Sequence, residues 1–400
     1  MFALTHIAPI RVPLAGFAAI GMGWGAYAAA LPVLKDRLGL SEADLGAALF
    51  FAALGALISM AFAPRIMPRL PGGGISLGIL GLGVSFSLIP FAQSLTDVIP
   101  IFCLIGLSTG FIDVVINARV SAVEAHTGRH YMSFAHGTFS LCYAIAALAM
   151  GFAREGGFTA SWLYTGLGIS VVMWVIFTRA DTDPPLESET PGLEKEKRAR
   201  LPFAVILTSI LITIAFFAEN ATEMWSALHI EETLGGRAAQ GALGPTVLGL
   251  TMAVGRFSGQ GLALRFGERR VMTTMALIAS LGGLVAAFAP NPFVGYIGFG
   301  GLGLGISALA PLGFSIGGKL LTNRNRAAGI ARMSFLGYLG FFFGPPLLGL
   351  IGEFFGLRIS FATVAVSLIL VPVILSRVPR SASPDARSAQ HSRKARTPAT

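Results

Sequence analysis

Long apolar runs dominate this 400-residue chain and constrain its fold more than any motif. An α-helix needs about 20 mostly apolar residues to cross the hydrocarbon core of a bilayer, and runs of about 18 or more are candidate spans. The chain contains twelve such runs, which predict twelve membrane-spanning helices. They cover residues 12–34, 43–63, 74–92, 98–119, 132–153, 159–178, 202–225, 241–263, 271–289, 293–316, 328–351 and 358–377.

The composition excludes a soluble globular protein. Hydrophobic residues make up 54% of the chain and charged residues only 12%, whereas about a quarter of the residues in soluble domains are charged. The chain also has 50 glycines, which suit membrane helices that approach one another closely. Pairs such as Gly21/Gly25 and Gly106/Gly110 have the small-xxx-small spacing of such helix contacts.

Several classes of partner and chemistry are not expected. The formal charge of +9 is spread over short loops and the C-terminal tail, without the basic patch that a nucleic-acid partner would require. Cys103 and Cys142 lie inside apolar runs and have no metal-ligand or disulfide spacing. The glycines at 72–74 lack the Lys-Ser/Thr of a phosphate-binding loop. We therefore expect no enzyme activity, metal or cofactor. The full-length first run, followed by another span, does not resemble a cleaved signal peptide.

One long polar segment divides the spans six and six. It contains Pro184-Pro185 and a run of Glu and Lys, so we expect a solvated linker. The predicted domains are residues 1–178 (a six-helix bundle), 179–201 (a cytoplasmic linker), 202–377 (a second bundle) and 378–400 (a disordered cytoplasmic tail). Two six-span halves in parallel repeat are an architecture of secondary transporters. The predicted fold is an all-α membrane protein with twelve transmembrane helices in two bundles.

The loop charges predict the orientation. Lys and Arg are retained in short cytoplasmic loops. If the N-terminus is cytoplasmic, most of the 29 basic residues fall on the cytoplasmic side, together with the C-terminus. The basic residues left in outside segments are Lys35, Arg37, Arg154, Arg237 and Arg358. We expect a multi-pass protein of a bacterial inner membrane, surrounded by lipid, with both termini cytoplasmic and a monomeric state.

The fourth run carries a carboxylate, Asp113, about two turns before its polar end. A charged side chain at membrane depth costs at least about 2.5 kcal/mol, so an intramembrane acid is a functional candidate. Asn117 lies four residues on, shares its helix face and is a candidate substrate contact. Two interpretations remain open for Asp113: a proton-coupling acid, or a structural ion pair with Arg119 or another cation.

The seventh run ends in a second polar group. Glu219 and Glu223 are one helical turn apart, with Asn220 and Trp225 beside them. Glu219 is a candidate second proton site or substrate acceptor, and Glu223, Asn220 and Trp225 are candidate substrate contacts. Alternatively, Glu219 lies at the lipid headgroups, Glu223 marks the end of the span, and Trp225 belongs to an interfacial aromatic belt.

Further candidates lie in other spans. His136 could relay protons toward Asp113 or bind substrate, or it could be a hydrogen-bonded packing residue. Aromatic side chains could line a cavity and stack on a ring, although packing is the alternative for each one. The substrate-contact candidates among them are Tyr27, Tyr143 and Tyr338.

Twelve spans, a six-six split and a repeated loop after spans two and eight resemble the major facilitator superfamily. Gly255-Arg256 through Leu264-Arg265 to Arg270 is similar to that superfamily's cytoplasmic gate motif, although Leu264 replaces its aspartate. The resemblance implies a cytoplasmic gate, with Glu268 or Glu124 as substitutes for the missing acid. The implied gate residues are Arg65, Arg69, Arg119, Arg256, Arg265, Glu268 and Arg269.

Within the superfamily, Gly110-Phe111-Ile112-Asp113 with Asn117 resembles the fourth-helix motif of the fucose permease branch of sugar:proton symporters. That resemblance implies that Asp113 is a coupling carboxylate. Two features depart from fucose permease. The first span has Ala28 to Pro32 where that protein carries a second acid, and residues 133–151 contain no Asn for the sugar.

The sequence therefore predicts a proton-coupled secondary transporter that moves a small polar, sugar-like solute by alternating access. Its expected partners are this small-molecule substrate and protons. The alternative is a proton-driven exporter of drugs or amphipathic metabolites, which the missing first-span acid favours. A receptor or membrane enzyme would require a large soluble domain or a paired nucleophile and base, and the sequence shows neither.

Overall fold

The computed structural model describes residues 8–70, 74–178, 201–322 and 326–380. These residues form helices and connections, and no strand occurs among them. The predicted linker 179–201 and tail 378–400 lie almost entirely outside the described residues. The α-helices are α2 (Arg11–Leu38), α3 (Glu42–Ile66), α4 (Ile75–Leu88), α5 (Leu95–Thr127), α6 (Met132–Glu155), α7 (Ala160–Met173), α8 (Phe203–Leu228), α9 (Ala238–Phe266), α10 (Glu268–Ala287), α11 (Pro292–Ile306), α12 (Leu309–Gly318), α13 (Arg326–Phe355) and α14 (Leu357–Arg377).

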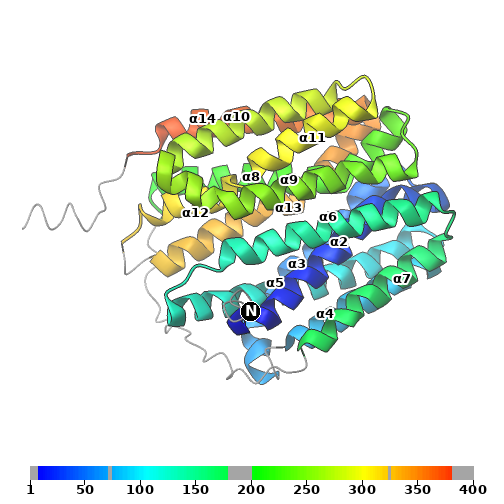
Figure 1. Cartoon of the computed structure of the whole chain (residues 1–400), viewed down its shortest axis with the longest axis horizontal. Coiled ribbons are helices and arrows are strands. Elements are labelled where there is room, and N and C mark those ends of the chain that lie inside the picture. The colour runs from blue at the N-terminus through cyan, green and yellow to red at the C-terminus, as the bar shows by residue number, and fades with distance from the viewer. Residues whose placement is uncertain (1–7, 71–73, 179–200, 323–325, 381–400) are drawn as a thin grey trace, which may run out of the picture.

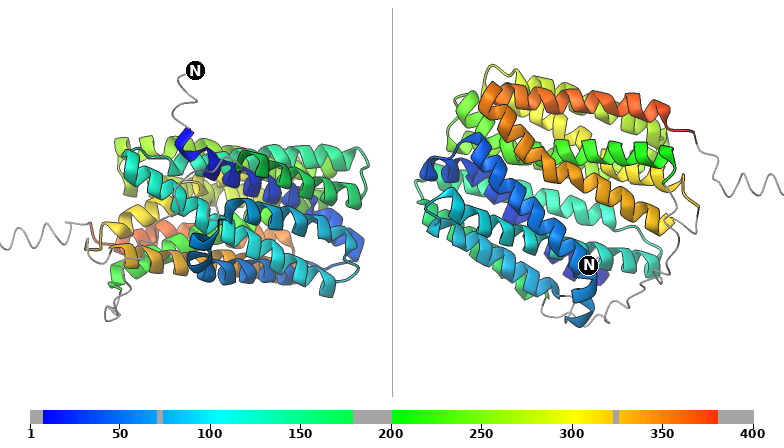
Figure 2. Two further views of the ribbon diagram at one scale, coloured as in Figure 1. Left: turned by 90° about the horizontal axis from the view of Figure 1, so that it is seen from below. Right: turned by 180° about the vertical axis from the view of Figure 1, so that it is seen from behind.

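The helices lie in two groups (Figure 1). We call α2–α7 the N-terminal group and α8–α14 the C-terminal group. The views from below and behind show the helices of both groups running along the same long direction (Figure 2). Ten helical segments of the described chain are long and apolar enough to cross a membrane. The all-helical membrane fold is thus confirmed, whereas the count of twelve spans stays a prediction.

Glycines set the distance between helices within each group. Gly21 and Gly25 of α2 lie against the carbonyls of Phe139 and Tyr143 in α6, where a Cβ atom would overlap them. Gly106 of α5 meets Ala52 of α3 in the same way. Lipid is as apolar as leucine, so membrane helices associate through such close packing rather than through apolar burial.

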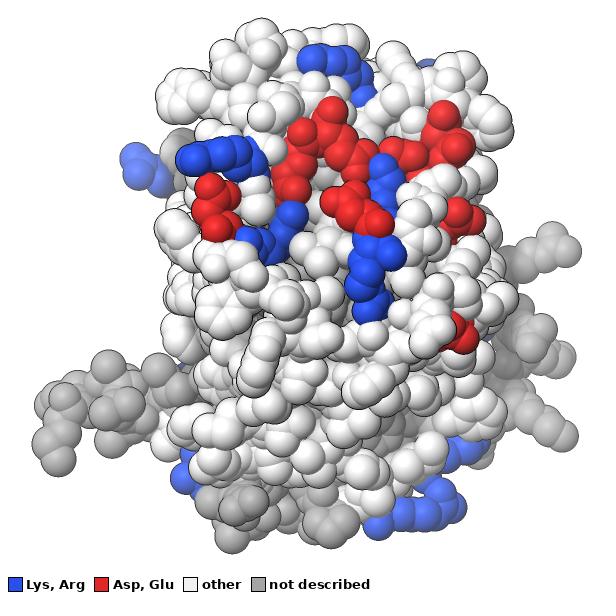
Figure 3. Space-filling view, turned by 90° about the vertical axis from the view of Figure 1, so that its right-hand side faces the viewer, with Lys and Arg blue, Asp and Glu red and all other residues white. Residues whose placement is uncertain are grey.

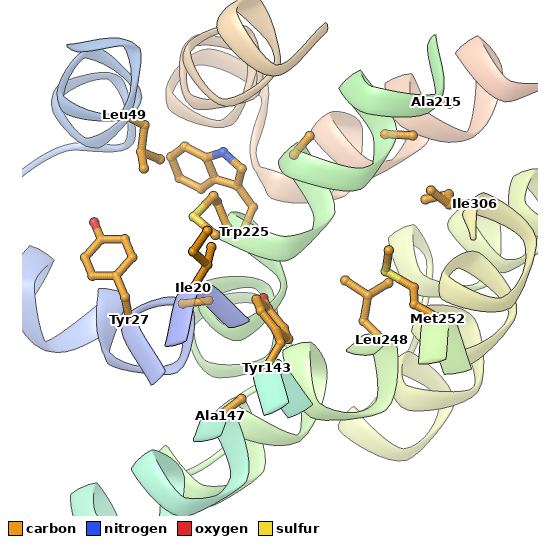
Figure 4. Close-up of a cluster of buried hydrophobic side chains, with 14 of the residues drawn as sticks. Ile20, Tyr27, Leu49, Tyr143, Ala147, Ala215, Trp225, Leu248, Met252 and Ile306 are labelled. Carbon is orange, nitrogen blue, oxygen red and sulfur yellow. The ribbon is translucent and has the colours of Figure 1, made fainter. Parts of the chain in front are cut away.

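A core of apolar and aromatic side chains lies between the two groups. Figure 4 shows Ile20, Tyr27 and Leu49 of the N-terminal group facing Trp225 of α8, with Tyr143 of α6 nearby. Tyr27, Tyr143 and Trp225 are all fully buried. The outward faces carry exposed Phe, Leu, Ile and Val side chains, as expected for helices that contact lipid.

Two helices differ from their predicted spans. The span predicted at 293–316 is not one helix, because α11 ends at Ile306 and α12 begins at Leu309. Ser307, at the break, donates its hydroxyl to the carbonyl of Leu304 at 2.6 Å. The seventh span is longer than predicted, because α8 continues into a π-helical turn, η6 (His229–Thr233).

Candidate functional site

A cavity of about 1220 Å³ lies between the two groups. It is lined by α2, α3, α5 and α6 on one side and by α8, α9, α12 and α13 on the other. It extends from Trp24 in the middle of α2 to Gly267 and the partly exposed Lys319. We call this end of the molecule the open end. The lining does not include Lys35 or Arg154, which lie at the opposite, closed end.

Asp113 of α5 lines the cavity and is bonded to both groups of helices. Its Oδ1 accepts a hydrogen bond from Asn117 Nδ2 at 2.9 Å, one turn along the same helix. Its Oδ2 accepts one from the hydroxyl of Tyr338 in α13 at 2.9 Å. Among the described residues Asp113 has no ion-pair partner, so the alternative of a structural pair with Arg119 or another cation is wrong.

The hydrogen bonds continue from Asn117 to α6. Its Oδ1 lies 3.3 Å from His136 Nε2, and the His136 ring meets Phe17 edge-on with centroids 4.9 Å apart. The hydroxyl of Ser140 then donates to the backbone carbonyl of His136 at 3.2 Å. His136 therefore both lines the cavity and is hydrogen-bonded, so the two interpretations made from the sequence are not exclusive.

Arg256 was predicted to belong to the cytoplasmic gate, and that role stays a prediction. It lies in α9 within the cavity lining, where Nη2 donates to Glu219 Oε1 at 2.5 Å. Nη1 donates to Ser140 of the N-terminal group. The two side chains of the ion pair are about nine-tenths buried. Arg256 thus joins α9, α8 and α6.

Glu223 is the carboxylate of the cavity that has no partner. Its residue is 7% exposed and lines the cavity, but no described residue forms a hydrogen bond or ion pair with its side chain. Only its backbone carbonyl is bonded, to the hydroxyl of Tyr143 at 3.1 Å across the two groups. Glu219 is also 7% exposed, so its alternative place at the lipid headgroups is wrong. Asn220 lines the cavity and donates to the carbonyl of Phe341 at 3.0 Å.

Three aromatic candidates lie outside the cavity lining. Trp225 and Tyr143 pack in the core between the groups (Figure 4), whereas the ring of Tyr27 packs against Trp24, Phe86 and Phe102 of its own group. The complete burial of Trp225 excludes a place in an interfacial aromatic belt. Neither the indole N–H of Trp225 nor the hydroxyl of Tyr27 finds a hydrogen-bond partner in the described chain. Tyr338 does line the cavity.

The remaining predicted gate residues make local contacts at the open end. Arg65 and Arg69 of the N-terminal group are exposed and donate to backbone carbonyls one turn back. Arg265 lies over the ring of Phe266, and Glu268 binds Lys319 at 2.6 Å. Arg269 donates hydrogen bonds to backbone carbonyls at the end of α14. Arg119 is buried in α5. Glu124, the other candidate for the missing gate acid, accepts hydrogen bonds from the backbone N–H groups of Tyr131 and Met132.

The closed end holds a set of ion pairs that the sequence did not predict. Lys35 lies between Glu42 at 3.0 Å and Glu232 at 2.6 Å, and Glu232 belongs to the other group. Arg154 binds both oxygens of Glu231 at 2.7 Å, again across the groups. Figure 3 shows acidic and basic side chains gathered on this end. We call Lys35, Glu42, Arg154, Glu231 and Glu232 the closed-end ion pairs.

A signal for these pairs was present in the sequence. Lys35 and Arg154 are among the few basic residues in the segments predicted to lie outside, where Lys and Arg are depleted. Acidic residues lie close to Lys35 and Arg154 in the sequence or in the other half of the chain. A single sequence, however, does not show which acidic residue forms an ion pair with each basic one.

In sequence, this chain is similar to known membrane proteins. The family model described as Major Facilitator Superfamily matches residues 14–263 and 208–399. An uncharacterized MFS-type transporter of Yersinia pestis is 26% identical over 369 residues, covering 90% of this chain and 93% of that protein. Membrane protein MosC of Rhizobium meliloti is 28% identical over 355 residues, covering 88% and 85%.

Solved structures share the fold at low identity. A bacterial homologue of the human lysosomal transporter Spinster, in an inward-facing and occupied conformation, has a TM-score of 0.71 and 13% identity. The match covers 92% of this chain and 96% of that one. The nucleoside transporter NupG has a TM-score of 0.68 and 11% identity, with 93% and 99% covered. At these identities the likeness concerns the fold alone.

Proposed function

The chain belongs to the Major Facilitator Superfamily, and we propose that it is a proton-coupled secondary transporter of a small polar, sugar-like solute. In this proposal it lies in a bacterial inner membrane with both termini cytoplasmic, so the open end faces the cytoplasm. The motif of Gly110, Asp113 and Asn117 supports a relationship to the fucose permease branch.

The hydrogen bond between Asp113 and Tyr338 carries the proposal. It joins a membrane-embedded carboxyl group of one group of helices to the other group, at the wall of the central cavity. Any movement that separates the groups at this depth must change the bonding of Asp113. The protonation of Asp113 and the arrangement of the two groups are therefore linked, as coupling requires.

Proton loading and release follow from solvation. Removal from water disfavours the charged form of a carboxyl group, so Asp113 would hold its proton while the cavity is closed. In the open form the cavity gives it access to water, and the proton can leave. His136, through Asn117, extends the hydrogen bonds from Asp113 toward α6 and is our proposed relay.

The cavity wall supplies groups that suit a hydroxyl-bearing solute. Glu223 offers an unbonded carboxylate, and Asn220 and His136 add polar atoms in the same lining. Glu219 is held by Arg256 in this conformation, which favours Glu223 as the first contact and Glu219 as a proton site used when that pair separates. Aromatic rings of Tyr338 and its neighbours in the lining could stack on a sugar ring.

Alternating access would require the closed-end ion pairs to separate while the open end closes. We propose that Tyr27 and Trp225 join the solute path in that outward-open form. Their buried polar atoms have no partner here, and a buried unpaired polar atom costs about 1–3 kcal/mol. Opening of the core between the groups would expose both atoms to water or solute.

A second function, proton-driven export of amphipathic compounds, is favoured by the many apolar side chains in the cavity lining, such as Phe17, Leu57 and Phe314. The same fold and the same Asp113 would serve it. The direction of transport and the solute separate the two functions.

The test is uptake by proteoliposomes under an imposed pH gradient, with a panel of sugars and organic acids. The proposal expects one or more solutes to accumulate only when the gradient is present. Solute uptake at the same rate with and without the pH gradient would contradict proton coupling. Raised drug tolerance of overexpressing cells without any sugar uptake would support the export function instead.

A further inference from the structure

A second cavity of about 790 Å³ adjoins the open end of the central cavity and shares Gly267 and Glu268 with its lining. It is formed where the first turns of α10 meet the last turns of α14, at the open end of the C-terminal group. The hydroxyl of Ser280 in α10 donates to the carbonyl of Ala365 in α14 at 2.8 Å, which holds the two helices together farther along. The transport mechanism proposed above makes no use of this cavity.

The charge of this second cavity is positive and uncompensated. Arg270 and Arg380 line it, and neither forms a hydrogen bond or ion pair with any described residue. Arg380 also lies close enough to Arg269 to repel it electrostatically. The acid in the wall, Glu268, is already bound to Lys319 at 2.6 Å and to Ser315. Within the part of the chain that the structure describes, these two exposed guanidinium groups therefore have no counter-anion.

Other groups in the wall suit an oxyanion. Gly267 and Glu268 at the N-terminus of the 20-residue helix α10 line the cavity. The first backbone N–H groups of a helix have no partner within it and carry partial positive charge, which favours a phosphate. Thr273 and Thr274 add hydroxyl groups to the same wall.

An apolar surface continues from the second cavity along both helices. On α10, Arg270 and Thr274 are followed on one helix face by Leu277 and Leu281, which are 49% and 64% exposed. Positions four and seven residues apart share a helix face. On α14, Leu370 and Val373 are 47% and 53% exposed and precede Arg380. A charged site thus lies at the end of two adjoining apolar stripes.

We infer that the second cavity binds a phospholipid with an anionic headgroup. Its phosphate meets Arg270 and Arg380, and its acyl chains follow the apolar stripes of α10 and α14. Arginine suits this role because its planar guanidinium binds phosphate oxygens in pairs. Basic pockets at helix ends on the cytoplasmic side are a recognised kind of site for anionic headgroups. The inference does not depend on the transported solute or on Asp113.

The test measures thermal unfolding and native mass spectra of delipidated, purified protein. Phosphatidylglycerol, phosphatidylcholine and inorganic phosphate are added in separate arms at equal phosphate concentration. The probe variant is Arg270→Gln/Arg380→Gln. The matched control is Arg65→Gln/Arg326→Gln, which removes two charges at the open end outside the second cavity. Arg270→Lys/Arg380→Lys retains the charge but not the paired geometry.

Phosphatidylglycerol should raise the unfolding temperature of the wild type and the control equally. Its affinity for the Gln probe variant should fall about 30-fold, since each basic residue near an anionic lipid contributes about 1 kcal/mol. The Lys variant should bind with intermediate affinity. Equal binding by the wild type and the Gln variant would overturn the inference. So would equal stabilisation by phosphatidylcholine, or by inorganic phosphate alone.

Discussion

The hydroxyl of Tyr338 donates a hydrogen bond to Oδ2 of Asp113 at 2.9 Å, although the two residues are 225 positions apart in the chain. Each belongs to a different group of helices, and both line the central cavity. Asp113 is thus tied to its own helix through Asn117 and to the opposite group through Tyr338. The bonding of one carboxyl group therefore reports the relative position of the two halves.

Removal of the Tyr338 hydroxyl should weaken coupling without loss of the fold. Hydrogen bonds to charged groups contribute about 1.5–3 kcal/mol, so Tyr338→Phe should reduce gradient-driven uptake roughly tenfold or more. Uptake kinetics in proteoliposomes measure this loss. The control is Tyr296→Phe, whose hydroxyl donates to the carbonyl of Gln240 outside the cavity lining. Equal uptake by both variants would show that the bond to Asp113 has no part in transport.

The Arg256–Glu219 pair should behave as a buried ion pair. Loss of one partner from such a pair costs about 3–5 kcal/mol, because the other charge stays buried and unpaired. Arg256→Gln should therefore lower the unfolding temperature markedly, whereas Arg256→Gln/Glu219→Gln should recover most of the loss. Thermal unfolding of the two single variants and the double variant gives the coupling between the residues. Additive effects would mean that the two side chains do not depend on each other.

The ion pair between Lys35 and Glu232 lies at the closed end, and it should stabilise the conformation in which that end is closed. Partly exposed ion pairs contribute about 1 kcal/mol, so Glu232→Gln should shift the population about fivefold toward the conformation that is open at the end with Lys35 and Glu232. Spin labels at Phe158 and Phe293, on exposed positions of the two groups, would report the separation by pulsed electron resonance. Cys103 and Cys142 would first be replaced by Ser.

A matched control exists for this measurement. Asp97→Asn removes another carboxylate near the same end, and the hydrogen bonds of Asp97 to Gln93 and Ser94 stay within the N-terminal group. It should leave the distance distribution close to that of the wild type. If Asp97→Asn and Glu232→Gln shift the distances equally, the pair does not act as a latch between the groups.

The sequence predicted the helices well because hydropathy determines which segments can enter a bilayer. Each predicted span overlaps a helix in the structure, but the break at Ser307 was missed. The sequence does carry a signal for it: Pro311 has no N–H to donate to the carbonyl of Ser307, four residues back, so the helix is interrupted there. The polar residues of the fourth span were also identified, because a carboxyl group in an apolar run is conspicuous.

Contacts between the halves could not be predicted in the same way. Arg256 was assigned to a loop motif, yet its side chain meets Glu219 and Ser140 in the cavity. Lys35 and Glu232 are separated by 197 positions, and only the packing of the two groups brings them together. The burial of Trp225 depends on that packing as well. Such long-range pairings are absent from any local pattern of one sequence.

The most direct test of the account is proton movement during transport by Asp113→Asn. Proteoliposomes that contain a pH-sensitive dye would be given a transported solute without an imposed gradient, and the internal pH would be followed. We predict that the wild type acidifies the lumen as solute enters. The Asp113→Asn variant should still exchange labelled for unlabelled solute but move no protons. Solute-dependent acidification by Asp113→Asn at the wild-type rate would contradict the account.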